Sequence, residues 1–271
     1  MNAVLRYRGA LWGFRTTLLL YVFLLVVVPL GGIYAQSFYG GWSTFVDSLM
    51  EPLAWQSVAL TFRLAIIATA INVVIGTLSA WVLHRYRFVG RTWLNSLVDL
   101  PFALPTAVGG LMILLLLGPG SFVGRLAESM GWRIVFAEPA IVAAMVFVTF
   151  PFVIRAVQPL LEEADLSEEE ASYTLGASRM YTFTRVTLPR MRPGIVSGAM
   201  LAFSRAMAEF GAVVLVAGNI PGKTLVASVY IFGEIESDHP QSAAVVSVLL
   251  LTLSFIVLWA IHWIQNRRKS S

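Results

Sequence analysis

The sequence predicts an all-α polytopic membrane protein, and three features of its composition support this fold class. Apolar residues make up 58% of the 271 residues, charged residues make up only 13%, and the mean hydropathy is +0.77. This balance is far from that of a soluble domain and is typical of a chain surrounded by lipid. Without any cysteine and with three histidines, the chain offers no disulfide framework, thiolate metal site or cysteine nucleophile. We therefore expect a single transmembrane domain over residues 1–271, with membrane lipid around it, no metal site and no catalytic residue.

Six charge-poor runs are long enough to cross a hydrocarbon core as helices, which takes roughly 20 apolar residues. They cover residues 17–36, 57–83, 93–117, 138–160, 194–217 and 241–266. The first run follows arginines, as a secretory signal does, but it is longer than the 7 to 15 apolar residues of a signal peptide. We expect it to remain as the first helix. The segment 37–56 carries Trp42 and Trp55, which are typical of a membrane interface, and is expected to be an outer loop.

The distribution of lysine and arginine between the short loops predicts the orientation, because cytoplasmic loops are enriched in these cations. Most of the 19 cations fall on one side, namely Arg6, Arg8, Arg15, Arg85, Arg87, Arg91, Arg179, Arg185, Arg190, Arg192, Arg267, Arg268 and Lys269. The other side has Arg125, Arg133 and Lys223. We therefore expect both termini and the segment 162–192 in the cytoplasm. The net charge of +4 follows from this topology and does not indicate a nucleic-acid partner.

The charged segment 162–192 is expected to form two short helices that meet at Gly176. Acidic residues come first and arginines later, an order that complements the helix dipole. Ser167 and Glu170 have the spacing of a capping box, and a glycine can break or tighten a turn. A solvated pair of surface helices would share these features. Apolar side chains would form one face that another molecule could contact, those of Leu175, Ala177, Met180 and Phe183.

Within this segment, the pattern Glu170-Ala171, Gly176, Val186 and Leu188-Pro189 resembles the EAA motif of ABC importer permeases. Ser172 stands where that motif usually has a second alanine, which is a small change. The resemblance implies that the segment is a coupling helix in a groove of a cytoplasmic ATPase subunit. Closure of the ATPase dimer would then reorient the membrane helices through a contact that differs between the two states.

A second pattern, from Ala217 to Thr224, satisfies a relaxed Walker A motif, but we do not expect nucleotide binding there. A phosphate-binding loop follows a strand and opens a helix, so that backbone amides converge on the phosphates. This segment follows a predicted membrane helix and lies on the predicted non-cytoplasmic side. We expect a tight turn in an outer loop.

The same turn belongs to a longer segment, Ser204–Thr224, that resembles sulfate/thiosulfate and molybdate permeases of the ABC importer class. Upstream, the segment 98–108 resembles the third-helix signature of the sulfate permease that pairs with a second, related permease. The resemblance extends over a core from about 55 to 266. The six-span length favours sulfate over molybdate.

Ionisable residues within the predicted spans are expensive in hydrocarbon and are therefore candidates for pairing or for the transport pathway. They are Arg63, Asp99, Arg155, Arg205 and Glu209. Depth in the membrane places Asp99 beside Arg155 and Arg63 level with Glu209, while Arg205 lies one helical turn from Glu209. We expect salt bridges that hold the helices in register, or an arginine that simply reaches for the interface.

The functional alternative is that Arg205 lines an oxyanion path, because a guanidinium and free backbone amides can bind a tetrahedral dianion without a metal. The third span could supply such amides where prolines and glycines interrupt it, at Pro101, Pro105, Gly109 and Gly110. Selectivity would then reside mainly in a separate binding protein.

Taken as implied by these resemblances, the chain is a transmembrane subunit of an ATP-driven sulfate or thiosulfate importer with the type I ABC importer permease fold. Its partners would be a second homologous permease, two cytoplasmic ABC ATPases and a periplasmic sulfate-binding protein, in a bacterial inner membrane. ATP and Mg would bind to the ATPases, so this chain needs no cofactor and is not an enzyme. The nearest alternative is a molybdate or tungstate permease. A secondary anion transporter or channel is more distant, because no inverted repeat stands out.

Overall fold

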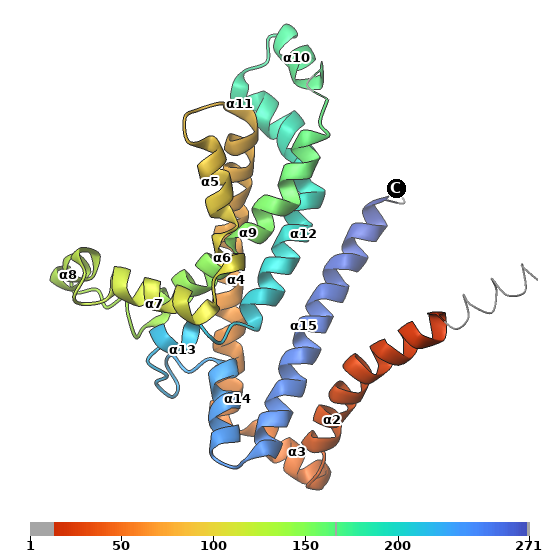
Figure 1. Cartoon of the computed structure of the whole chain (residues 1–271), viewed down its shortest axis with the longest axis vertical. Helices are drawn as coiled ribbons and strands as arrows, with labels where there is room; N and C mark the ends of the chain where they lie inside the picture. The colour runs from red at the N-terminus through yellow and green to blue at the C-terminus, as the bar shows by residue number, and fades with distance from the viewer. Residues whose placement is uncertain (1–13, 166, 270–271) are drawn as a thin grey trace, which may run out of the picture.

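The computed structural model describes residues 14–165 and 167–269, and every regular element within these ranges is a helix (Figure 1). The elements are η1 (Phe23–Val27), α2 (Val28–Ser37), α3 (Gly41–Met50), α4 (Pro52–Arg85), α5 (Arg91–Val98), α6 (Leu100–Ala103), α7 (Thr106–Leu117), α8 (Phe122–Ser129), α9 (Glu138–Glu162), α10 (Ser167–Thr174), α11 (Arg179–Thr182), η2 (Phe183–Thr187), α12 (Leu188–Met207), α13 (Val213–Val216), α14 (Ala227–Glu236) and α15 (Pro240–Lys269). The terminal cations Arg6 and Arg8, used above for the orientation, lie outside the described residues.

Among the described residues, four helices are long and apolar enough to cross a membrane, and they become five when the pair α7 and α8, bent by 54°, is counted as one span. The four are Phe14–Ser37, Pro52–Arg85, Glu138–Glu162 and Pro240–Ala260. Each coincides with a predicted run, so the first, second, fourth and sixth predicted spans are present as helices. The third and fifth predicted spans are broken within the described ranges, and six continuous helices are not seen.

The third predicted span, 93–117, is divided among α5, α6 and α7. Pro101 lies in the first turn of α6, where the missing N–H of proline is tolerated. Leu104 is extended, with φ −91° and ψ 140°, because the ring of Pro105 excludes the residue before it from the helical region. Prolines therefore interrupt this span as predicted.

The fifth predicted span, 194–217, ends early, because α12 stops at Met207 and a turn leads into the short helix α13. The turn is stabilised by Glu209, whose Oε1 accepts the backbone N–H of Ala212 at 2.8 Å. Next to it, a Cβ on Gly211 would lie 2.2 Å from the hydroxyl of Thr106 at the start of α7. The turn thus fits against the broken third span, and hydropathy alone could not place it.

The core of the molecule is formed by α4, α9 and α12, which pack side by side (Figure 1). Small residues allow their backbones to approach closely, as is common between membrane helices. A Cβ on Gly194 would lie 2.4 Å from the carbonyl oxygen of Ala156, and one on Gly110 would lie 2.5 Å from that of Ala212. Gly110 therefore lies inside α7, where it allows close packing. We had expected Gly110 to interrupt the third span, and this prediction was wrong.

Helix 14–37 lies away from this core, next to α15 (Figure 1). None of its apolar window is buried within the chain. A helix that is apolar all round and unburied belongs in lipid or against another chain. This region therefore supports the prediction of a membrane-embedded protein.

Candidate functional site

The segment predicted to contact another subunit forms one end of the molecule, where α10 projects beyond the core (Figure 1). Its helix begins at Ser167, whose backbone N–H donates to Oδ1 of Asp165 at 2.9 Å. This hydrogen bond lowers the pKa of the Asp165 carboxyl below its ordinary value. Asp165 thus takes the N–H of Ser167, which the predicted capping box would have paired with the side chain of Glu170. Glu170 and Ala171 are both exposed on α10.

Gly176 follows α10 at the turn that the sequence predicted between two short helices. Its φ is +84°, in the left-handed region that residues with a Cβ rarely adopt. The N–H of Gly176 donates to the carbonyl of Tyr173 at 2.9 Å, and the N–H of Ala177 donates to that of Ser172 at 3.1 Å. These two bonds are the Schellman motif of a helix C-terminus. They fix the angle between α10 and α11.

Glu169 connects α10 to the membrane core, which the sequence did not single out. Its Oε2 lies 3.0 Å from Nη2 of Arg85 at the end of α4, and its Oε1 accepts the hydroxyl of Thr187 at 2.8 Å. A neighbouring pair, Glu168 with Arg190, has the same 3.0 Å separation. Six acidic residues lie between positions 162 and 170, and the sequence gives no reason to prefer one of them. Only the tertiary structure distinguishes Glu169 from the others.

The hydrophobic-x-Leu-Pro part of the motif lies at the junction of η2 and α12. Val186, Leu188 and Pro189 are half-buried, and α12 starts at Leu188. The N–H of Leu188 donates to the carbonyl of Phe183, which makes η2 a π-turn. Pro189 has no N–H and its ring disfavours the carbonyl four residues earlier, so a widened turn before it relieves the helix.

Two of the four residues predicted for the exposed apolar face of this segment are exposed, while Ala177 and Phe183 are half-buried. Leu175 is 87% exposed and Met180 is 71% exposed, as expected for a contact surface. Phe183 instead turns inward, with its ring centroid 4.9 Å from that of Trp81 on α4. Tyr181, 56% exposed, takes its place on the surface. We define Leu175, Met180 and Tyr181 as the apolar tip.

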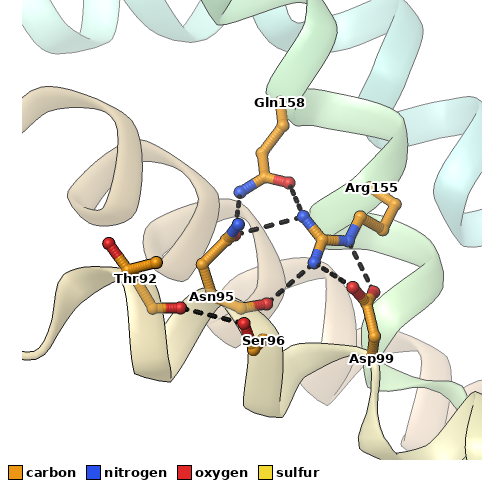
Figure 2. A network of polar contacts seen from close by, with 6 residues as sticks. All are labelled: Thr92, Asn95, Ser96, Asp99, Arg155 and Gln158. Atoms are coloured by element: carbon orange, nitrogen blue, oxygen red, sulfur yellow. Dashed lines mark hydrogen bonds and ion pairs between the residues drawn. The ribbon is translucent and has the colours of Figure 1, made fainter.

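Arg155 on α9 holds the broken third span in place (Figure 2). Its Nε and Nη2 donate to the two carboxylate oxygens of Asp99 at 2.7 and 2.6 Å. The remaining N–H groups donate to the backbone and side-chain oxygens of Asn95 and to Oε1 of Gln158. A guanidinium has five N–H donors, and all five have an acceptor here. The predicted pairing of Asp99 with Arg155 is present, and Asn95 and Gln158 complete it.

Arg205 and Glu209 form the predicted ion pair, although the helix ends between them. Nη1 of Arg205 lies 2.7 Å from Oε2 of Glu209. The Glu209 side chain is fully buried, whereas that of Arg205 is 34% exposed. The backbone carbonyl of Glu209 accepts the hydroxyl of Ser228 on α14. Glu209 thus fastens the turn after α12 from two sides.

Arg63 does not lie near Glu209 as depth suggested, but pairs with Glu138 at the start of α9. Both side chains are largely exposed, at 57% and 43%. The sequence missed Glu138 because it stands at the boundary of a predicted span rather than inside one. Arg63 and Glu138 are 75 residues apart in the sequence, so only the fold brings them together.

The Walker-like segment Ala217–Thr224 is a turn, as predicted. It follows the helix α13 rather than a strand. The carbonyl of Ile220 accepts the amides that would otherwise point at a phosphate, those of Lys223, Thr224 and Leu225. The segment therefore lacks the open nest of N–H groups that a phosphate-binding loop requires.

Comparisons with known proteins agree with this architecture. Among solved structures, a bacterial ABC transporter involved in the import of the acidic polysaccharide alginate is similar in fold, with a TM-score of 0.81 and 15% identity over 97% of this chain and 96% of that chain. The inward-facing MetNI methionine ABC transporter has a TM-score of 0.60 and 20% identity over 80% and 98% of the two chains.

Sequence relatives are much more similar. The probable sulfate transport system permease protein cysT of Nephroselmis olivacea is 40% identical over 95% of this chain and 91% of its own length. The sulfate transport system permease protein CysT of Escherichia coli (strain K12) is 40% identical over 96% of this chain and 95% of its own length. The family model described as binding-protein-dependent transport system inner membrane component matches residues 72–270. The chain therefore belongs to the family of binding-protein-dependent transport system inner membrane components.

Proposed function

We propose that this chain is the transmembrane permease subunit of an ATP-driven ABC importer that moves sulfate, and thiosulfate as its close analogue, into the cytoplasm. The observation that carries this function is the 40% identity to permeases named for sulfate transport, which extends over 96% of the chain. That stretch includes both the predicted coupling segment and the segment 204–224. The chain is a transport subunit, and ATP hydrolysis belongs to partner subunits that bind ATP and Mg.

Coupling to those ATPases takes place at the end of the molecule formed by α10 and α11. The apolar tip would enter a groove of the ATPase, while the exposed Glu170 and Ala171 would line the same contact. Gly176 sets the angle of this contact through its left-handed φ of +84°. A displacement of α10 would reach α4 and η2 through the bonds of Glu169 to Arg85 and Thr187.

Val186, Leu188 and Pro189 would transmit the same displacement into the membrane. They form the junction of η2 with α12, and α12 is one of the three helices of the core. A π-turn at this position can widen or relax more easily than a regular helix. The junction therefore serves as the point where α12 changes its angle.

The full importer would contain a second homologous permease, two ABC ATPases and a periplasmic sulfate-binding protein. The exposed apolar surface of helix 14–37 is suited to lipid and to the second permease. With the cation-rich loops in the cytoplasm of a bacterial cell, both termini and α10 face the ATPases. In this topology the third and fifth predicted spans, 93–117 and 194–217, still cross the membrane although their helices are broken. The chain then crosses the membrane six times.

Uptake of labelled sulfate tests the function directly. Bacteria that lack their own sulfate permease would receive this chain with its neighbouring transporter genes. Sulfate uptake that thiosulfate inhibits and excess molybdate does not inhibit supports the proposal. Strong inhibition by molybdate would instead indicate the molybdate or tungstate permease. Uptake by this chain alone, driven by an ion gradient in vesicles, would indicate a secondary anion transporter.

A further inference from the structure

A cavity of about 700 Å³ lies at the end of the core opposite α10. It is bounded by the first half of α4, by the segment leading into α9 and by the turn after α13. Sites for small molecules typically have volumes of 300 to 1,000 Å³. The cavity is therefore large enough for a small hydrated ligand.

Three cationic side chains from these separate segments line the cavity. Arg63 comes from α4, Arg133 from the segment before α9, and Lys223 from the turn after α13. The one acid in the lining, Glu138, is paired with Arg63. Within the described part of the chain, the charged groups of Arg133 and Lys223 have neither a hydrogen bond nor an ion pair. The cavity thus has an excess of positive charge that the chain does not neutralise.

The position of these cations is unusual for their side of the molecule. The loops predicted to face outward carry only Arg125, Arg133 and Lys223. Two of these three line the same cavity, although they are far apart in the sequence. A cleft lined by charges of one sign raises the local concentration of the opposite ion by about 10- to 1,000-fold. The arrangement therefore favours an anion.

Neutral donors complete the lining. The hydroxyl of Thr224 accepts the backbone N–H of Ile220 at 3.0 Å, which leaves the hydroxyl proton available to a ligand. The amide of Gln56 on α4 also lines the cavity, next to the turn at Gly222. A tetrahedral oxyanion accepts hydrogen bonds at every oxygen, so guanidinium, ammonium, hydroxyl and amide donors can all bind it.

We propose that this cavity is a binding site for a tetrahedral oxyanion, in which Arg63, Arg133 and Lys223 hold sulfate that the binding protein has released before it enters the membrane. The role of the anion as transported substrate rests on the proposed function, whereas anion binding itself does not. The volume exceeds that of one bare anion, so sulfate keeps part of its water and binds weakly. Weak binding suits a site that must pass its ligand onward. A lipid phosphate has the same chemistry, and the test below distinguishes the two sources.

The absence of cysteine from the chain allows the site to be probed by a single introduced thiol. Ala59→Cys places the thiol in the lining, and Ser129→Cys on α8 is a control outside the cavity. The complete importer would be reconstituted in phosphatidylcholine vesicles, and the reaction of each thiol with anionic and neutral methanethiosulfonates would be followed by the mass of this chain. We expect the anionic reagent to react preferentially at position 59, and sulfate to slow that reaction.

Removing the two unpaired charges should abolish this preference. In the Arg133→Gln, Lys223→Gln double variant, we expect the reaction of Ala59→Cys with the anionic reagent to slow by about tenfold and protection by sulfate to disappear. Arg125→Gln removes a cation of the same side whose guanidinium donates to the carbonyl of Gly120 outside the cavity, and it should change neither quantity. Equal effects of the double variant and of Arg125→Gln would overturn the proposal.

Further measurements distinguish sulfate from the two other ligands that the cavity could bind, a lipid headgroup and an acidic protein surface. Protection in phosphatidylglycerol vesicles without added sulfate, and none by sulfate in phosphatidylcholine, would assign the cavity to a lipid headgroup and overturn the role for free sulfate. If the double variant loses stimulation of ATP hydrolysis by the binding protein while sulfate protection is unchanged, the cations dock an acidic protein surface instead. If the wild-type importer shows protection by sulfate but no sulfate uptake, the proposed function fails and anion binding stands.

Discussion

At the end of the core near α10, Arg155 uses all five of its N–H donors within the chain, whereas at the opposite end Arg133 and Lys223 have no partner among the described residues. Both ends place cations beside membrane helices. The first end is saturated, so its charges can hold α5 and α9 together but have no donor left for a ligand. The second end has donors to spare and about 700 Å³ of space in front of them.

This difference shows that the presence of a charge near a membrane span does not by itself indicate its role. The decisive quantity is the number of hydrogen-bond donors that remain after the contacts within the chain are satisfied. Arg155 illustrates a structural arginine, and the cavity illustrates a candidate binding site. The substitutions below would sharpen or break this comparison.

The largest effect on stability is expected at the saturated end. Arg155→Met should remove the bidentate contact with Asp99 and the bonds to Asn95 and Gln158. Hydrogen bonds to charged groups contribute about 1.5–3 kcal/mol each, and the partial exposure of this cluster reduces the total to the lower part of that range. We expect a loss of about 2 kcal/mol, measured as a lower midpoint of thermal unfolding of the assembled importer.

Arg155→Lys is the matched control, because it keeps the charge but lacks the planar fork that contacts both oxygens of Asp99. Its midpoint should fall between those of the wild type and Arg155→Met. An unchanged midpoint in both variants would show that the saturated cluster does not hold the third span in place.

The next effect concerns coupling and is expected at Gly176. A Cβ there meets no atom of this chain within 4 Å, so the expected cost of Gly176→Val within the chain is the backbone strain at its φ of +84°. A residue with a Cβ in the left-handed region costs about 1–2 kcal/mol. We expect α10 to change its angle and ATP-driven sulfate uptake to fall by more than about tenfold, since 1.4 kcal/mol corresponds to tenfold.

Gly131 provides a closely matched control for this prediction. Its φ is +77°, a Cβ there also meets nothing within 4 Å, and it follows α8, far from α10 along the chain. Gly131→Val should carry the same backbone strain and leave the uptake per assembled importer largely unchanged. Equal losses of uptake in the two variants would mean that strain alone, rather than coupling at α10, explains the result.

The sequence predicted the turn at Gly176 and the pairing of Asp99 with Arg155, but it failed for two other contacts. Gly176 was found because a glycine between acidic and basic helical segments marks a turn, and the pairing of Asp99 with Arg155 followed from their equal depth. Depth failed for Arg63, which pairs with Glu138, because depth says nothing about which helices are neighbours. Phe183 was predicted on the exposed face, because its apolar character alone does not show that Trp81 on α4 lies beside it.

The breaks in the third and fifth predicted spans were missed for a different reason than the contacts of Arg63 and Phe183. A hydropathy window averages over Pro105 and over the turn at Glu209, so the segments around them still register as one apolar run. Leu104 leaves the helical region because of the proline that follows it, which is a local signal. The end of α12 depends on a contact between Gly211 and Thr106, which only the folded chain provides. The sequence also could not predict the cavity, because its lining residues come together only in the folded chain.

A smaller effect on stability is expected at the open end, for the pair of Arg63 and Glu138. Both side chains are largely exposed, and exposed ion pairs contribute about 0–1 kcal/mol. Glu138→Gln should therefore change the midpoint of thermal unfolding little, and a double-mutant cycle with Arg63→Gln should give a coupling energy below about 1 kcal/mol. A coupling energy as large as the loss in Arg155→Met would remove the contrast between the two ends.

The smallest expected effect depends on pH and involves Asp165. Its pKa is lowered below the ordinary value of 3.8 by the hydrogen bond from the N–H of Ser167. A carboxyl with a lowered pKa stabilises the fold fully above its ordinary pKa, and this contribution is lost as the pH falls through the lowered value. Amide exchange at the start of α10, measured between about pH 3 and 6, should show less protection at the acidic limit. Asp165→Asn should remove this dependence on pH.

The most direct test of the contrast between the two ends is the initial rate of sulfate uptake, divided by the amount of assembled importer, for Arg155→Met and for the Arg133→Gln, Lys223→Gln double variant. We expect Arg155→Met to lower the amount of assembled importer. We expect the double variant to assemble normally and to take up sulfate about tenfold more slowly per importer when sulfate is limiting. Normal uptake per importer in the double variant, or a loss of assembly equal to that of Arg155→Met, would contradict the assignment of an anion site to the open end.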